Sequence, residues 1–243
     1  MQISSHLYLV GSDQLGITTP MDPNVYLIDG GDEKALIDLG RASSIDILRA
    51  NMREHGFDMD RSVTAILTHS DAGHSEMCAA AKGKYGVKVW APAGAEELLA
   101  TGTNPRVRTL YEYEVYGKDY RFPTVEIDRI IHHGDTLSIG NIEVQAIQVR
   151  GHSDDSLCLL ATVDGARVIF TGDTIFYGGV IGLVNLPGSS IEDYRSDINR
   201  LGELRVDSLF PAHGMFVLRN GQKHLDAAIT AFRSEHLPPN QLL

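Results

Sequence analysis

The stretch from Leu67 to His74, which reads LTHSDAGH, decides the fold of this chain. It follows an apolar run that starts at Ser62 and precedes a segment rich in alanine, so it connects a predicted strand to a predicted helix. Three later segments also place a histidine or an aspartate directly after an apolar run: GHS at 151–153, TGDT at 171–174 and PAHG at 211–214. Together the four segments contain six candidate ligands, His69, Asp71, His74, His152, Asp173 and His213. Imidazole nitrogens and carboxylate oxygens at the ends of strands indicate a site for more than one metal ion.

Composition and charge narrow the class of protein. The chain has 243 residues and a net charge of -11, which argues against a nucleic-acid surface and against an anionic membrane surface. No apolar run approaches the length of about 20 residues that a membrane helix needs, and the first residues lack the pattern of a signal peptide. We therefore expect a cytoplasmic protein with a small-molecule substrate. The two cysteines, Cys78 and Cys158, lie in apolar stretches and are expected to be buried free thiols.

The order of elements predicts an α+β fold. Both halves of the chain alternate strand-like runs with helices such as 43–55 and 223–235, which favours two packed sheets with helices outside. We expect one domain over residues 1–243, with an insertion at about 104–125 and the boundary between the halves near residue 125. The insertion is rich in tyrosine, and Tyr113 and Tyr116 are candidates for lining a substrate pocket. Plain packing or a subunit contact explains them equally well, and the second would make the protein a homodimer.

The motifs and their order resemble the metallo-β-lactamase-fold superfamily, in its glyoxalase II-like and lactonase-like branch. The resemblance spans nearly the whole chain and is carried by NVYLID at 24–29, ALIDLG at 35–40, the His69 stretch, FTGD at 170–173, LPGS at 186–189 and PAHG at 211–214. It implies a four-layer αββα sandwich with metals at the strand ends between the sheets.

The ligand motif departs from the family pattern His-x-His-x-Asp-His. Asp71 stands where the family has its second histidine, and Gly73 stands where it has its aspartate. Carried over by position, the resemblance implies a first metal site of His69, Asp71 and His152. It implies a second site of His74, Asp173 and His213, with Asp173 bridging the two ions.

The resemblance implies a hydrolase in which a metal-activated water attacks an ester, thioester or lactone. Two divalent ions are expected, with zinc as the first choice and iron or manganese as the alternatives. The carboxylate at Asp71 motivates a second hypothesis, because two histidines and one carboxylate are typical of non-haem iron in oxidoreductases. The loss of an aspartate at Gly73 motivates a third, a catalytically weak relative that binds or senses a ligand.

Overall fold

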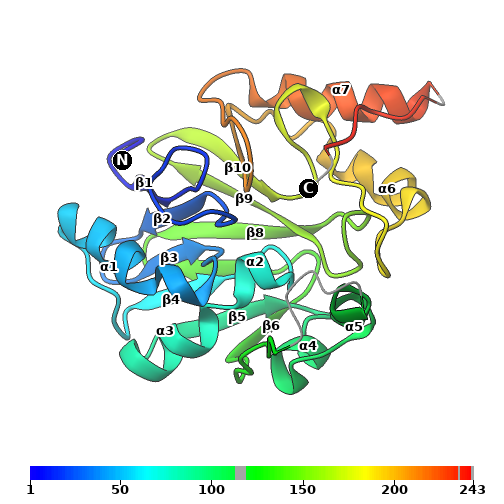
Figure 1. The fold of residues 1–243 in the computed structure, drawn as a ribbon. Coiled ribbons are helices and arrows are strands. Elements are labelled where there is room, and N and C mark those ends of the chain that lie inside the picture. Colours follow the sequence, from blue (N-terminus) through cyan, green and yellow to red (C-terminus); the bar gives the residue numbers. More distant parts are fainter. Residues whose placement is uncertain (113–118, 235, 242–243) are drawn as a thin grey trace. The chain divides into compact units, whose positions relative to one another are not determined.

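The chain folds into two compact units, Met1–Ile131 and His132–Leu243, and each contains one β-sheet (Figure 1). The computed structural model describes residues 1–112, 119–234 and 236–241. The boundary lies at residue 131 rather than near 125, because a last short strand of the first sheet follows the insertion. That strand has only three residues, too few to reveal an alternating pattern in the sequence.

The first unit contains a six-stranded mixed sheet with the strand order β1-β2-β3-β4-β5-β6. Its strands are β1 (Leu7–Gly11), β2 (Val25–Asp29), β3 (Lys34–Ile37), β4 (Val63–Ile66), β5 (Lys88–Pro92) and β6 (Arg129–Ile131). The strands from β3 to β6 pair in parallel, so their carboxyl ends meet one edge of the sheet. The residues that follow β3 and β4, Asp38 and the Leu67–His74 stretch, therefore lie at the same edge.

Helices of the first unit pack on its sheet through apolar side chains. They are η1 (Ala42–Ser44), α1 (Ile45–Glu54), α2 (Ala72–Ser75), α3 (Cys78–Tyr85), α4 (Glu96–Thr101) and α5 (Pro105–Glu112). Leu48 of α1 and Ala81 of α3 join Val63 and Ala65 of β4 in one buried cluster, and Figure 1 shows α1 and α3 on the same side of the sheet. The alternate residues of a strand point to one face, which explains why Val63 and Ala65 share the helices.

The second unit contains a five-stranded sheet with the order β11-β10-β9-β8-β7. Its strands are β7 (Thr136–Ile139), β8 (Ile142–Gln148), β9 (Leu157–Val163), β10 (Ala166–Gly172) and β11 (Ser208–Pro211). Because β9 is antiparallel to both β8 and β10, and β11 is parallel to β10, the strands β8, β10 and β11 run in one direction. His152, Asp173 and His213 follow these three strands and so come to one edge of the sheet.

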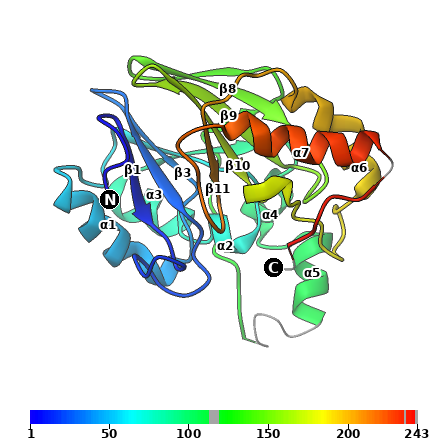
Figure 2. The same cartoon turned by 90° about the horizontal axis from the view of Figure 1, so that it is seen from above.

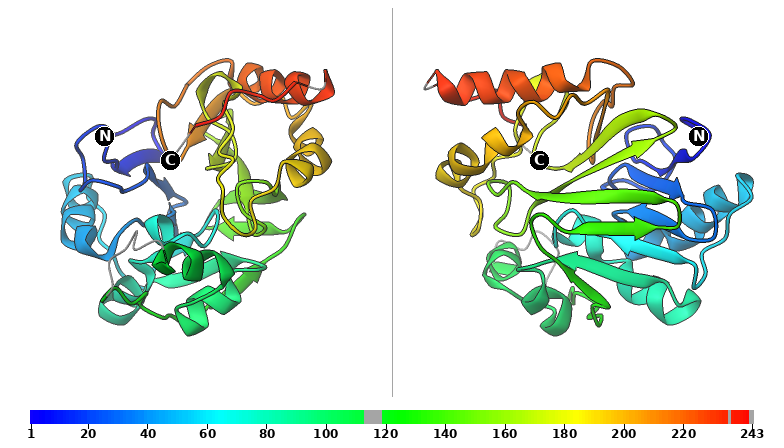
Figure 3. Two further views of the ribbon diagram at one scale, coloured as in Figure 1. Left: turned by 45° about the vertical axis from the view of Figure 1, so that its right-hand side comes forward. Right: turned by 180° about the vertical axis from the view of Figure 1, so that it is seen from behind.

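Two helices cover one face of the second sheet. The helical elements of this unit are η2 (Tyr177–Gly179), α6 (Ile191–Asp197), η3 (Ile198–Leu201) and α7 (Gly221–Arg233). Tyr194 of α6 stacks on Phe232 of α7, and both views in Figures 2 and 3 show these helices side by side. Their apolar residues share a cluster with Ile169 and Leu209 of the sheet. In the described part of the chain, no helix combines the length and the apolar character of a membrane-spanning segment.

Candidate metal centre

The first group of predicted ligands lies at the carboxyl edge of the first sheet. His69 and His74 are both buried, and their ring centroids are 4.1 Å apart. Asp71 precedes the short helix α2, which turns the chain so that His74 returns towards His69. The Nε2 atom of His69 is 3.8 Å from Oδ2 of Asp71. The structure therefore brings the three predicted residues of this segment together.

A buried carboxylate orients His74. Asp38, directly after β3, accepts hydrogen bonds from the Thr68 backbone N–H (2.8 Å) and the Thr68 hydroxyl, and its Oδ2 lies 3.0 Å from Nδ1 of His74. A carboxylate only accepts, so the proton of the imidazole lies on Nδ1 and Nε2 keeps its lone pair for a metal. The sequence analysis gives Asp38 no role at the site, because it appears there only within the ALIDLG run. The only signal for it was its position, directly after a strand that pairs in parallel with β4.

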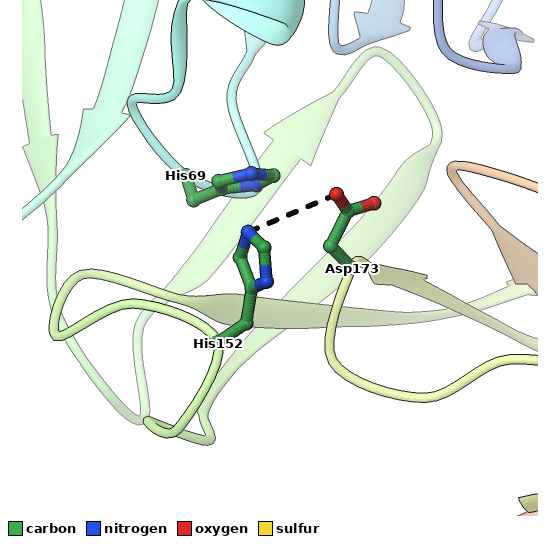
Figure 4. Close-up of side chains that lie close together, drawn as sticks. All are labelled: His69, His152 and Asp173. Atoms are coloured by element: carbon green, nitrogen blue, oxygen red, sulfur yellow. Dashed lines mark ion pairs between the residues drawn. The ribbon is translucent and has the colours of Figure 1, made fainter. Parts of the chain in front are cut away.

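The second group lies at the carboxyl edge of the second sheet. Asp173 is buried between two histidines, with Oδ2 at 3.7 Å from Nε2 of His152 and Oδ1 at 3.8 Å from Nε2 of His213. Figure 4 draws His69, His152 and Asp173, and its dashed line marks the pair of His152 and Asp173. His152 is buried and His213 is partly buried. The structure thus brings together the three predicted ligands of this unit.

The backbone of Gly182 orients His152. The carbonyl oxygen of Gly182 lies 2.6 Å from Nδ1 of His152, so Nδ1 carries the proton and Nε2 faces Asp173. A side chain cannot be accommodated at position 182, because a Cβ there would lie 2.1 Å from the carbonyl oxygen of Asp173. Sequence reasoning missed Gly182, since nothing in the residues around it marks a contact 30 positions away.

The spacing of the donor atoms fits a metal ion. Distances of 3.7 and 3.8 Å in the second unit are too long for hydrogen bonds. Two atoms that each lie about 2.1 Å from one ion are separated by about 3 to 4 Å. The imidazole of His152 with its proton fixed on Nδ1, the imidazole of His213 and the buried carboxylate of Asp173 are the kinds of donor that zinc and similar divalent ions take.

Asp71 is held differently from the other predicted ligands. Both of its carboxylate oxygens accept hydrogen bonds from Arg106 of α5, at 2.6 Å from Nε and 2.7 Å from Nη2. Sequence reasoning gave Arg106 no role, because the insertion that contains it has no clear period. The pocket candidates Tyr113 and Tyr116 lie outside the described residues.

Neither cysteine contributes a reactive group. Cys78 and Cys158 are buried free thiols, as the sequence predicted. Burial raises the pKa of the Cys78 thiol well above its usual range, and burial raises the pKa of Cys158 to about 12. Both side chains therefore stay protonated at neutral pH.

Comparisons with known proteins agree with these features. Acyl-coenzyme A thioesterase MBLAC2 of Homo sapiens is 28% identical over 78% of this chain and 72% of the relative. Atrochrysone carboxyl ACP thioesterase of Aspergillus fumigatus is 26% identical over 82% of this chain, and the match spans only about half, 53%, of that protein.

Solved structures share the fold. A metallo-β-lactamase of Cronobacter sakazakii with a HARLDQ motif superposes with a TM-score of 0.75 at 21% identity, covering 97% of this chain and 93% of the other. A B3 metallo-β-lactamase with an active-site glutamic acid also gives 0.75, at 22% identity and with 97% and 89% covered. The predicted α+β fold, that of the metallo-β-lactamases, is thereby confirmed. A family model described as the metallo-beta-lactamase superfamily matches residues 18–213, and the chain belongs to that superfamily.

Proposed function

We propose that this chain is a metal-dependent thioesterase, which adds water to the carbonyl group of an acyl thioester. Its broader class, a hydrolase of the metallo-beta-lactamase superfamily, follows from family membership and from its thioesterase relatives. The observation that carries the finer proposal is that Asp173 lies at ligand spacing from His152 and His213, in a chain whose relatives include two kinds of thioesterase. The substrate is a small molecule or a carrier-bound acyl group.

Five residues serve the metal centre in this proposal: His69, His74, His152, Asp173 and His213. The family match includes all five positions, which supports the binding of two divalent ions. Zinc is the proposed metal because imidazoles dominate the set, and manganese or iron are the alternatives. Bound divalent ions supply Lewis acidity, which lowers the pKa of a water molecule and polarises a carbonyl oxygen.

The chain's own residues hold the donors ready for that chemistry. Asp38 keeps the Nδ1 proton of His74 in place, and the Gly182 carbonyl does the same for His152. Water is the proposed nucleophile, and the protonated, buried thiols of Cys78 and Cys158 support this, since a thiol of raised pKa is a poor nucleophile. The iron oxidoreductase hypothesis depended on Asp71 as a ligand, and both oxygens of Asp71 accept bonds from Arg106, which favours the hydrolase.

The test is a substrate panel with the zinc-loaded protein. Acyl-coenzyme A esters of increasing chain length are followed by release of the free thiol, with a lactone and a β-lactam as comparison substrates. We expect thioester turnover to fall more than about 100-fold in Asp173→Ala, since losing even a partner of a ligand costs about 10- to 100-fold in activity or metal affinity. His132→Gln is the matched control, because His132 is exposed on the same unit. Turnover of the lactone or the β-lactam alone would refute the thioesterase proposal, and iron with oxygen uptake would favour the oxidoreductase.

A further inference from the structure

The hydroxyl of Tyr194 contacts two backbone segments beside the second group of ligands. Tyr194 belongs to α6 and is fully buried. Its hydroxyl donates a hydrogen bond to the carbonyl oxygen of Thr174 (3.0 Å), the residue that follows Asp173. The same oxygen accepts a hydrogen bond from the Gly182 backbone N–H (3.3 Å). One hydroxyl therefore joins the segment after Asp173 to the segment whose carbonyl orients His152.

The ring of Tyr194 lies against the loop that leads into His152. A Cβ added at Gly151 would overlap carbon atoms of the ring, so the backbone at position 151 packs directly on it. The carbonyl oxygen of Gly151 also accepts hydrogen bonds from the Ser190 backbone N–H (2.9 Å) and the Ser189 hydroxyl (2.8 Å), at the start of α6. The residue before His152 is thus held by the same helix that carries Tyr194.

The backbone at Gly182 depends on contacts of this kind. A glycine reaches more backbone conformations than other residues do, so its own chain does not fix the direction of its carbonyl group. The Tyr194 hydroxyl holds the N–H of Gly182 on one side of the α-carbon. On the other side, the Leu183 N–H shares a peptide group with that carbonyl and donates to Oδ1 of Asn240 (2.8 Å). Together the two bonds set the direction from which the carbonyl meets Nδ1 of His152.

We propose that Tyr194 is a positioning residue of the metal centre, whose hydroxyl keeps His152 and Asp173 at the separation that a shared ion needs. That separation is 3.7 Å between Nε2 of His152 and Oδ2 of Asp173. The inference rests on the proposed function in one respect, since it takes these two residues as metal ligands. Loss of the hydroxyl should disturb both ligands at once, because it frees the backbone at Thr174 and at Gly182.

The test replaces Tyr194 by phenylalanine, which removes the hydroxyl and keeps the ring that stacks on Phe232, so the variant should fold. Tyr8→Phe in the first unit is the matched control. The Tyr8 hydroxyl donates to the Ser5 carbonyl oxygen (2.9 Å) and accepts from the Gln2 side-chain amide (3.3 Å), which repeats the two kinds of bond at Tyr194. Both variants should therefore lower the urea midpoint of the metal-free protein.

Two further measurements separate positioning from stability. The first is zinc affinity by competition with a chromophoric chelator, which should weaken about tenfold in Tyr194→Phe, the lower end of the range for partners of a ligand. Tyr8→Phe should stay within about twofold of wild type. The second is the ring tautomer of His152 in the metal-free protein, followed by long-range proton–nitrogen NMR. Wild type and Tyr8→Phe should carry the proton on Nδ1, whereas Tyr194→Phe should show a mixture with Nε2.

Two results would overturn the inference. One is a zinc affinity of Tyr194→Phe within about twofold of wild type. The other is a His152 ring that stays protonated on Nδ1 in that variant, since weaker zinc binding would then not arise through the Gly182 carbonyl. The NMR measurement needs no metal, so it tests Tyr194 separately from a failure of the wild type to bind zinc, which would instead refute the proposed function.

Discussion

Replacing Asp38 by asparagine should weaken zinc binding by changing the tautomer of His74. The Asp38 carboxylate is 1% exposed and can only accept, so it holds the His74 proton on Nδ1 across 3.0 Å. An asparagine of the same shape offers an N–H₂ group at that place. His74 can then accept at Nδ1 and carry its proton on Nε2, the nitrogen that a metal requires.

The magnitude follows from the contacts that the carboxylate makes. Loss of a partner that orients a ligand typically weakens metal affinity about 10- to 100-fold, or about 1.4 to 2.7 kcal/mol. Asp38 also accepts from the backbone N–H and the hydroxyl of Thr68. Hydrogen bonds to a charged group contribute about 1.5 to 3 kcal/mol, so the metal-free variant should lose free energy of unfolding of that order.

Two quantities are measured: zinc affinity, by competition with a chromophoric chelator, and the urea midpoint of the metal-free protein. A control variant is needed to separate an effect on zinc affinity from an effect on stability. Asp22 is a second buried carboxylate of the first unit, and it accepts hydrogen bonds from the Arg41 backbone N–H (2.8 Å), the Ser44 hydroxyl and Thr19, none of which is a histidine. Asp22→Asn should therefore lower the urea midpoint and leave zinc affinity unchanged, whereas Asp38→Asn should lower both. Equal zinc affinity in the two variants would refute the argument from the His74 tautomer.

Three further predictions concern residue 73, Asn240 and Asp197. Gly73→Asp should raise zinc affinity, measured by competition with a chromophoric chelator, because the family places an aspartate at this position. Position 73 has an ordinary backbone conformation, and a Cβ there would meet only the Met21 carbonyl oxygen at 3.7 Å. Weaker zinc binding would show that the carboxylate cannot reach the metal. Asn240→Ala should lower zinc affinity, but by less than tenfold. The Asn240 amide exchanges two 2.8 Å hydrogen bonds with the backbone of Leu183, which is next to the carbonyl that orients His152. An unchanged zinc affinity together with a lower urea midpoint would contradict this prediction. Burial alone would raise the pKa of Asp197, but hydrogen bonds from Arg150 lower it below 3.8, so its stabilisation is present above about pH 4 and disappears as the pH falls through the folded-state pKa. Urea unfolding of Asp197→Asn should accordingly show a smaller loss of stability between pH 4 and 2 than the wild type, and an identical loss would contradict the shift.

The sequence could predict that the candidate ligands of the second unit lie together, because each comes shortly after a strand. His152, Asp173 and His213 come after β8, β10 and β11, which run in one direction, so topology alone gathers them at one edge. The residues that orient the ligands could not be predicted in the same way. Gly182 acts through its backbone carbonyl, which every residue type possesses, so its identity carries no signal for the contact with His152.

The role of Asp71 shows a different limit of the sequence. A carboxylate between two histidines has the same appearance whether its counter-charge is a metal ion or a guanidinium. The contact with Arg106, 35 residues further along in an insertion without clear periodicity, left no signal in the sequence. A local sequence motif therefore does not reveal a contact that a long side chain from another element makes with one of its residues.

The two oriented histidines, one in each unit, differ in the kind of acceptor that holds their Nδ1 protons. A carboxylate makes the imidazole of His74 more basic than a neutral carbonyl makes that of His152, so His74 should be the stronger donor of the two. The weaker acceptor is also the one that substitution cannot remove, because Gly182 contributes only backbone, and any side chain there would collide with the carbonyl of Asp173. Mutation can therefore act on the tautomer of His74 directly through Asp38, while at His152 it acts through the segment 181–183 and the residues that hold it, Tyr194 and Asn240.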